Sequence, residues 1–177
     1  MRTLVIVTHP NINQSTVNRT WRDTLEQHED IVTVHELYAT YPDLDIDIEY
    51  EQKLLSEHDQ IIFQFPLYWY SYPPLMKKYF DDVLAYGWAY GSNGHALKGK
   101  TFAAAISVGA TEEQYHSESW LGFSLETLLS PFIATAKFVG ANYNGYHALF
   151  GALNPTQEDL EQSVASYIEF IKGMEVE

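Results

Sequence analysis

Three short segments of the chain carry side chains that could bind a ligand or move a proton. Residues 13–18 read Asn-Gln-Ser-Thr-Val-Asn, a run of amide and hydroxyl groups. Residues 65–74 read FPLYWYSYPP, which places half-polar aromatic rings beside prolines. The third segment has the small pair Gly109-Ala110, followed by Tyr115 and His116. These residue types suit hydrogen bonding to a neutral or anionic ligand rather than metal binding.

The polar run at 13–18 stands where a helix is expected to begin. Unpaired backbone N–H groups and the helix dipole favour an anion at such a position, and Ser15, Thr16 and Asn18 offer further donors. Ser15 is equally typical of a simple helix cap, so cap and phosphate site both stay open, and they are compatible. The segment contains neither GxxxxGK[ST] nor GxGxxG, which leaves a nucleoside triphosphate or Rossmann dinucleotide site unsupported.

The aromatic and small-residue segments favour a flat ligand. Tyrosine and tryptophan rings combine apolar area with polar tips, and Pro73 and Pro74 end the preceding strand and turn the chain. A planar heteroaromatic ligand fits such a wall, while an aromatic core cluster or a dimer interface is the alternative. Gly109-Ala110 lets backbone approach a flat ligand closely. The Tyr115-His116 pair is a weak signal by itself.

The elements that position these segments alternate between strand and helix. Apolar and β-branched runs predict strands at 3–8, 31–34, 60–65, 102–108 and within 138–150. Helical patterns cover 15–27, 47–58, 74–86, 119–137 and 156–172, the last capped by Thr156. This alternation predicts an α/β fold, a doubly wound five-stranded parallel sheet with helices on both faces, in a single domain spanning 1–177. Ligands of such sheets lie beyond the carboxyl ends of the strands, which selects the loops 9–18, 66–73 and 109–116.

Composition excludes several classes of function. The 177 residues include 46% hydrophobic and 19% charged residues, as in a globular domain, and no cysteine, which argues against disulfides and thiolate metal sites and for a reducing cytoplasm. No metal ligands are assigned. The apolar run at 4–7 is too short for a signal peptide, and no run reaches the roughly 20 residues of a spanning helix.

A net charge of −14 argues against nucleic acid as a partner, because binding to it depends on Lys and Arg. The acids between Glu36 and Asp59 indicate a solvated helix face, or alternatively a docking surface for a basic partner.

Several longer patterns together carry a family resemblance. They are THP at 8–10, SxxN at 15–18, TYPDLDID at 40–47, FPLYWYSYPPLMKKYFDDV at 65–83, GWAYG at 87–91, ALKGK at 96–100 and SVGA at 107–110. The chain resembles the flavodoxin-like NAD(P)H:quinone oxidoreductase family, the group of DT-diaphorase. Within it, the chain is similar to short bacterial members, which include ancillary oxidoreductases of glutathione-gated potassium efflux systems.

The resemblance implies a flavin bound at the three loops and two-electron ping-pong transfer from NAD(P)H to a quinone or related acceptor. It assigns the flavin phosphate and ribityl chain to the first loop, the isoalloxazine ring to the second and its pyrimidine edge to the third. The residues so matched are His9, Ser15, Thr16, Val17 and Asn18; Pro66, Leu67, Tyr68, Trp69 and Tyr70; and Ser107, Val108, Gly109 and Ala110.

The same resemblance implies the catalytic residues, the cofactor and the partners. Tyr115 matches a catalytic tyrosine, but Leu121 occupies the position of the family's histidine, so His116 is the candidate substitute and its role stays open. The short C-terminus favours FMN, with FAD as the alternative. A homodimer in the cytoplasm is expected, with possible peripheral association with a potassium-efflux membrane protein at the inner membrane face. A regulatory subunit of that efflux protein and an electron-carrier flavodoxin are the competing functions.

Overall fold

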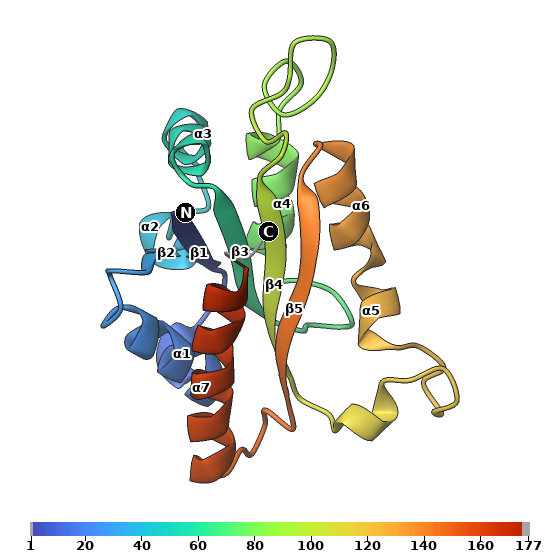
Figure 1. Cartoon of the computed structure of the whole chain (residues 1–177). Coiled ribbons are helices and arrows are strands. Elements are labelled where there is room, and N and C mark those ends of the chain that lie inside the picture. The colour runs from blue at the N-terminus through green and yellow to red at the C-terminus, as the bar shows by residue number, and fades with distance from the viewer. Residues whose placement is uncertain (1, 175–177) are drawn as a thin grey trace.

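A five-stranded parallel sheet forms the centre of the molecule in the computed structural model, which describes residues 2–174 (Figure 1). Its strands are β1 (Thr3–Val7), β2 (Val32–Glu36), β3 (Gln60–Pro66), β4 (Thr101–Val108) and β5 (Asn142–Phe150). The strand order is β2-β1-β3-β4-β5. The chain adds β2 on one side of β1 and the later strands on the other side, so the switch point lies between β1 and β3. Every neighbouring pair is parallel. The expected α/β doubly wound sheet is confirmed. Met1 and residues 175–177 of the expected domain lie outside the described residues, and its extent stays a prediction.

Helices cover both faces of the sheet, as predicted (Figure 1). One face carries α1 (Thr16–Leu25) and α7 (Gln157–Gly173), and the other carries α3 (Ile48–Glu57), α4 (Pro74–Val83) and α6 (Ser130–Phe138). Short helical turns complete the fold: η1 (Ile12–Gln14), α2 (Leu37–Thr40), η2 (Glu112–Gln114) and α5 (Leu125–Leu128). No helix within residues 2–174 is long and apolar enough to cross a membrane.

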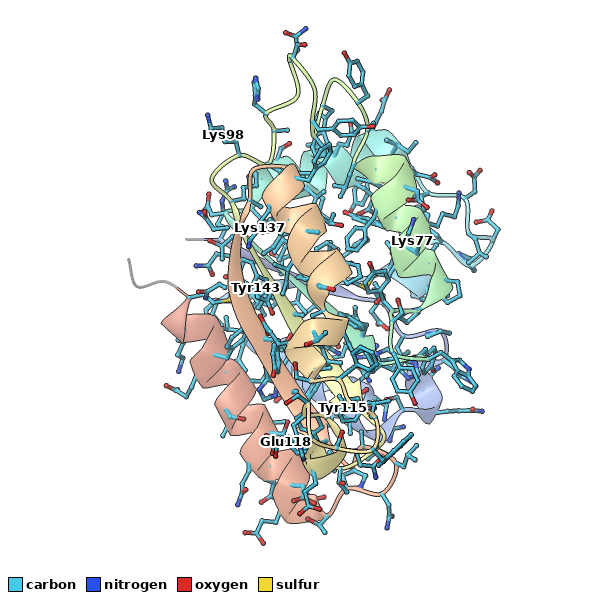
Figure 2. All side chains as sticks on the ribbon, turned by 90° about the vertical axis from the view of Figure 1, so that its right-hand side faces the viewer. Lys77, Lys98, Tyr115, Glu118, Lys137 and Tyr143 are labelled. Carbon is cyan, nitrogen blue, oxygen red and sulfur yellow. The ribbon has the colours of Figure 1, made fainter. Side chains whose placement is uncertain are left out.

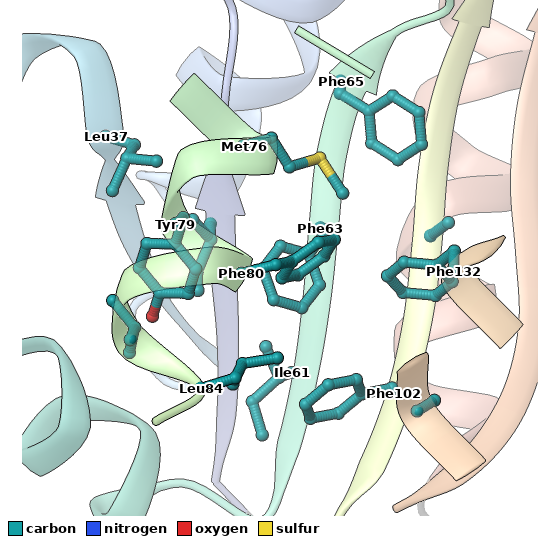
Figure 3. Packing of buried hydrophobic residues seen from close by; sticks show 14 of the residues in the cluster. Leu37, Ile61, Phe63, Phe65, Met76, Tyr79, Phe80, Leu84, Phe102 and Phe132 are labelled. Atoms are coloured by element: carbon teal, nitrogen blue, oxygen red, sulfur yellow. The ribbon is translucent and has the colours of Figure 1, made fainter. Parts of the chain in front are cut away.

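Each face of the sheet has its own hydrophobic core. On the α4/α6 face, the ring of Phe63 lies 5.0–5.7 Å, between centroids, from those of Phe80, Phe102 and Phe132 (Figure 3). Such edge-to-face contacts are a favourable arrangement of aromatic rings. Leu4, Ile61 and Met76 fill the remaining space around them, fully buried. This packing holds α4 and α6 against β3 and β4.

The core on the opposite face is smaller and contains a buried histidine. The ring of His147 on β5 stacks on Tyr167 of α7 at 4.9 Å with an interplanar angle of 3°. Trp21 Nε1 donates to Ser163 Oγ at 3.0 Å, and His147 Nε2 lies 3.2 Å from the same hydroxyl. This cluster fastens α1 and α7 to β5 and to one another.

The predicted long helix over 119–137 is wrong in its first half. Residues 115–124 are irregular, and the helical part is split between α5 and α6. Ser124 caps α5 by accepting from the N–H of Thr127 at 3.1 Å, and Gly122 has φ +75°. Pro131 lies in the first turn of α6, where its missing N–H is tolerated. These local signals, a cap and a first-turn proline, outweigh the apolar periodicity. The helix predicted to reach Tyr86 also ends early, at Val83.

The acidic segment is not wholly a solvated face. Glu51 of α3 is fully buried, and its Oε1 accepts from the Tyr41 hydroxyl at 2.7 Å and lies 2.8 Å from His35 Nε2. The prediction that these acids lie on the surface is therefore wrong for Glu51, because His35 on β2 and Tyr41 after α2 bind its carboxylate in the interior.

Candidate functional site

The three segments singled out in the sequence meet at the carboxyl edge of the sheet. Val7 pairs with Gln64 across β1 and β3, and Pro66 pairs with Ser107 across β3 and β4. The pairing continues beyond the strand, since the N–H of Leu67 donates to the Ser107 carbonyl at 2.9 Å. The loops after β1, β3 and β4 therefore leave the sheet side by side. This is the switch point at which doubly wound sheets bind their ligands.

The first loop ends in a capped helix N-terminus. Ser15 is the N-cap of α1, and its Oγ accepts from the N–H of Asn18 at 3.1 Å. The remaining N–H groups of the first turn have no partner within the helix. Asn18 is only 1% exposed, and its side-chain Nδ2 donates to Ser107 Oγ at 2.7 Å. The cap is confirmed, and the Asn18 amide is directed to β4.

His9 offers a neutral donor beside this helix. Its Nδ1 accepts from the N–H of Asn11 at 3.1 Å, so the imidazole hydrogen of the neutral ring is on Nε2. Burial lowers the pKa of His9, which keeps the ring uncharged at neutral pH. The ring stands edge-on to Tyr68, with centroids 6.3 Å apart. Helix dipole, hydroxyl and imidazole N–H together suit a phosphate without a formal positive charge.

The aromatic segment forms a tight two-residue turn. Tyr68 and Ser71 exchange both backbone hydrogen bonds, at 2.9 and 3.0 Å. The residues between them, Trp69 and Tyr70, have φ of 48° and 64°. Two central residues with positive φ characterise a type I′ turn, which favours Asn-Gly. Large side chains there cost on the order of 1–3 kcal/mol each, and such strain concentrates at functional sites.

The rings of this turn lie on the surface of the single chain. Trp69 is 92% exposed, and Tyr68 and Tyr70 are 42% and 40% exposed. The alternative of an aromatic core cluster is therefore wrong for these three residues. The core-cluster alternative is correct for Tyr72, whose ring packs edge-to-face on Phe65 and Phe80. The segment therefore has a packed part at Tyr72 and an exposed part, the turn at 68–71, that is free to meet a ligand.

The third loop is held by a segment that the sequence reasoning missed. After β5, the N–H groups of Gly151 and Ala152 donate to the carbonyls of Ala110 and Val108, both at 2.9 Å. A Cβ on Gly109 would lie 3.2 Å from Leu153 Cγ, a tight contact that the exposed Leu153 side chain would have to relieve by shifting. The rule that ligands lie beyond the carboxyl ends of strands applies equally to β5 and would have selected residues 151–153.

Tyr115 and His116 occupy different environments. Tyr115 is half-buried, with its ring 5.7 Å from that of Phe150. Burial raises its pKa, and the phenol of Tyr70 raises it further, so Tyr115 is a neutral hydroxyl donor at ordinary pH. His116 is exposed. The side-chain view places Tyr115 at the end of the sheet opposite Lys98 (Figure 2). The third loop thus brings Tyr115, and not His116, toward the aromatic turn.

These features match a known family. The chain belongs to the family described as Flavodoxin-like fold, which matches residues 1–171. It is 45% identical to the uncharacterized NAD(P)H oxidoreductase YrkL of Bacillus subtilis, over 98% of this chain and 99% of that one. It is 39% identical to the glutathione-regulated potassium-efflux system ancillary protein KefG of Yersinia enterocolitica, over 97% and 93% of the two chains.

Solved structures agree with this assignment. General stress protein 14 of Treponema denticola, in complex with FMN, superposes with a TM-score of 0.93 and 44% identity, over 98% of this chain and 99% of that one. An NADPH-quinone reductase of P. pentosaceus superposes with a TM-score of 0.88 and 30% identity, over 97% and 98%. The resemblance to flavodoxin-like NAD(P)H:quinone oxidoreductases expected from the sequence is confirmed.

Proposed function

We propose that this chain is an FMN-dependent NAD(P)H oxidoreductase that reduces quinones or related acceptors by a two-electron ping-pong reaction. One observation carries the proposal: a donor-rich helix N-terminus, a strained aromatic turn and a small-residue turn meet at the switch point of the sheet. The names of the relatives supply the reaction class, and the FMN in the similar structure supplies the cofactor.

The residues present fit FMN. Its single phosphate belongs at the N-terminus of α1, near the Ser15 hydroxyl and the Nε2–H of His9, and its ring belongs between the aromatic turn and residues 107–110. The flavin supplies the hydride chemistry. The protein's part is to bind the cofactor, leave one ring face open, and donate hydrogen bonds where negative charge develops. Tyr115 is the side chain placed for that donation, while the exposed His116 is the weaker candidate.

The proposal extends to assembly and location. Aromatic side chains are exposed on one chain, notably Trp69 at 92%, Trp120 at 77%, Tyr86 at 73% and Phe138 at 71%. Aromatic residues are enriched at protein interfaces. A groove of about 520 Å³ between α4 and α6 includes Phe138 and Tyr90 in its lining. These surfaces support a homodimer, and the lack of cysteine among the 177 residues supports a location in the reducing cytoplasm.

The experiment reconstitutes the purified protein with FMN under anaerobic conditions. NADH or NADPH should bleach the visible flavin absorbance, and a quinone should restore it, with parallel lines in double-reciprocal plots at varied quinone. Which nicotinamide bleaches faster identifies the donor. Protein that binds neither FMN nor FAD contradicts the proposal. Flavin that binds but is not bleached by either nicotinamide would instead indicate an electron-carrier flavodoxin.

A second candidate function rests on the similarity to KefG. In it, the chain is an ancillary subunit that binds a potassium-efflux membrane protein, and reductase activity is secondary. Co-purification with such a membrane protein distinguishes the two. Retention of that complex by a variant with no bound flavin would show that binding does not depend on the reductase site.

A further inference from the structure

Buried polar side chains join the helix N-terminus to both central strands. The donor Nε2 of Gln64 on β3 lies 3.0 Å from the carbonyl oxygen of Asn18 in α1. The donor Nδ2 of Asn18 lies 2.7 Å from Ser107 Oγ on β4. Gln64 is fully buried, and Asn18 and Ser107 are 1% and 7% exposed. A continuous path of hydrogen bonds therefore runs from β3 through α1 to β4.

The surrounding acceptors fix the direction of this path. Gln64 Nε2 faces both the carbonyl and, at 3.5 Å, the side-chain Oδ1 of Asn18. If the Gln64 amide were turned over, its oxygen would face two other oxygens, so only one orientation is compatible with the site. Asn18 then has its own donor free for Ser107. The hydroxyl hydrogen of Ser107 is the last donor of the path.

The backbone of the same residues holds all three loops. The N–H of Thr8, where the first loop begins, donates to the carbonyl of Gln64 at 2.8 Å. The carbonyl of Ser107 accepts from Leu67, where the aromatic loop begins. Ser107 is also the first residue of the small-residue turn. A shift of Gln64 would therefore change the spacing of the loops that leave the sheet around it.

We propose that Gln64 is a positioning residue: it sets the separation between the N-terminus of α1 and the turn at Ser107, and thereby the fit of FMN between them. This inference rests on the proposed function and extends it to a residue outside the predicted flavin contacts. Gln64 acts through Asn18 and Ser107. Its Oε1 has no hydrogen-bond partner within the described residues, so the side chain leaves one buried polar atom unsatisfied, a cost that an apolar side chain of similar size would avoid.

The chain provides a matched control in Gln60. It lies four residues earlier on β3, on the same face of the sheet, and is also fully buried. Its side chain accepts from Thr3 Oγ1 and donates to the carbonyl of Met174, both at 2.8 Å. Four residues of strand separate the two glutamines by about 13 Å. Gln60 is thus the same residue type with the same burial, but it lies at the opposite end of the strand from the site.

The experiment compares Gln64→Met with Gln60→Met, since methionine keeps the volume and removes the donor. Thermal melts of the FMN-free proteins should fall in both variants. FMN titration should show Kd raised at least about tenfold in Gln64→Met, with a changed visible circular dichroism spectrum of the bound flavin, and unchanged within about twofold in Gln60→Met. Equal Kd values and spectra in the two variants would overturn the inference and leave Gln64 a packing residue.

A double-mutant cycle tests the path through which Gln64 acts. The effect of Gln64→Met on FMN affinity should shrink in a Ser107→Ala background, because the end of the path is already lost. Purely additive effects would overturn the inference.

Should Gln64→Met not fold, Gln64→Glu keeps the shape of the side chain. Relative to wild type, its FMN affinity should recover as pH falls and the carboxyl is protonated. A ratio of the two affinities that stays constant with pH would overturn the inference. Wild-type protein that binds no FMN would instead refute the proposed function.

Discussion

At the scale of single residues, the proposed phosphate end of the site is built on a helix cap and a neutral imidazole. Ser15 caps α1, and His9 is held neutral with its hydrogen on Nε2. The aromatic turn adds shape rather than charge, and it holds Trp69 and Tyr70 in a strained backbone conformation. Small changes at these residues should therefore separate ligand binding from folding.

Replacing Ser15 by aspartate should weaken FMN binding without loss of the helix. Aspartate caps a helix as well as serine does, but its carboxylate repels the phosphate by about 1 kcal/mol per unit charge at 4 Å even in water. We expect a Kd for FMN raised at least about fivefold at an unchanged melting temperature. Ser124→Asp, at the N-cap of α5, is the control and should leave the Kd unchanged. An unaltered Kd in Ser15→Asp would place the phosphate elsewhere.

Replacing the strained pair, as Trp69→Asn with Tyr70→Gly, should stabilise the protein and impair turnover. Asn-Gly is the preferred pair of a type I′ turn, so relief of strain should raise the free energy of unfolding by on the order of 1 kcal/mol. Loss of the exposed Trp69 ring costs little, while loss of the Tyr70 ring, which is 40% exposed, offsets part of the gain. Denaturant melts and kcat/KM for quinone measure the two effects. Lower stability of the variant would show that the rings hold the turn in place.

Replacing Tyr115 by phenylalanine tests the proposed hydroxyl donor. Flavin content should stay normal, while flavin reduction by NAD(P)H in a single turnover should slow. Loss of a donor where charge develops strongly raises a barrier by about 2.7–4 kcal/mol, and delocalisation over the flavin makes the effect smaller here. His116→Ala, which removes an exposed side chain, is the comparison. A Tyr115→Phe rate equal to that of wild type removes this hydroxyl from the mechanism.

At the scale of elements, buried polar contacts decide how the helices attach to the sheet. Gln64 and Asn18 connect β3 to α1, and Glu51 connects α3 to β2 through His35. Such contacts are specific because each lost partner leaves another polar group buried and unsatisfied. Hydrophobic packing on both faces provides the bulk of the attraction, and these side chains select one arrangement of the elements.

Removal of Glu51 should therefore be strongly destabilising. Glu51→Ala leaves His35 and the Tyr41 hydroxyl without their buried acceptor, and we expect a loss of about 3–5 kcal/mol in the free energy of unfolding. Glu49→Ala, an exposed position on the same helix, should change it by less than about 0.5 kcal/mol. Urea melts measure both. Similar small effects in the two variants would mean that water replaces the lost contacts.

At the scale of the whole molecule, stability should depend on pH through a buried histidine. Burial lowers the pKa of His147 from 6.5 to about 4. Above pH 6.5 the residue is neutral in both states, and between pH 6.5 and 4 the unfolded chain takes up a proton that the folded chain does not. The stability linked to His147 is thus complete above pH 6.5 and is lost as pH falls, by about 2 kcal/mol at pH 5.

His147→Gln should remove this dependence. The glutamine does not titrate, so the stability difference between wild type and variant should narrow by about 2 kcal/mol from pH 7 to pH 5. Chemical denaturation at each pH gives the free energies of unfolding. His95→Gln, at an exposed position, should leave the wild-type profile intact. Parallel profiles for wild type and His147→Gln would show that the folded protein accommodates the imidazolium.

The order of the elements and the place of the candidate site can be read from the sequence. Uninterrupted apolar strands alternating with helices leave few arrangements other than a doubly wound sheet, whose loops at the carboxyl edge form the candidate site. Ser15 as a cap was readable because a cap depends on neighbouring residues, whereas the turn with positive φ at Trp69 and Tyr70 was not, because large side chains disfavour it. The break of the helix over 119–137 was missed although Ser124 and Pro131 signalled it locally.

Only the tertiary structure decided which side chains face one another across the sheet. By sequence Glu51 is a typical surface acid, but in the structure His35 and Tyr41 bind its buried carboxylate. By sequence Leu153 is an ordinary loop residue, but in the structure its side chain lies next to Gly109. The sequence does not distinguish Gln64 from Gln60. The direction of β3 places Gln64, and not Gln60, at the end of the strand next to the candidate site. These contacts join residues far apart in the chain, so their free energies depend on packing that no local pattern contains.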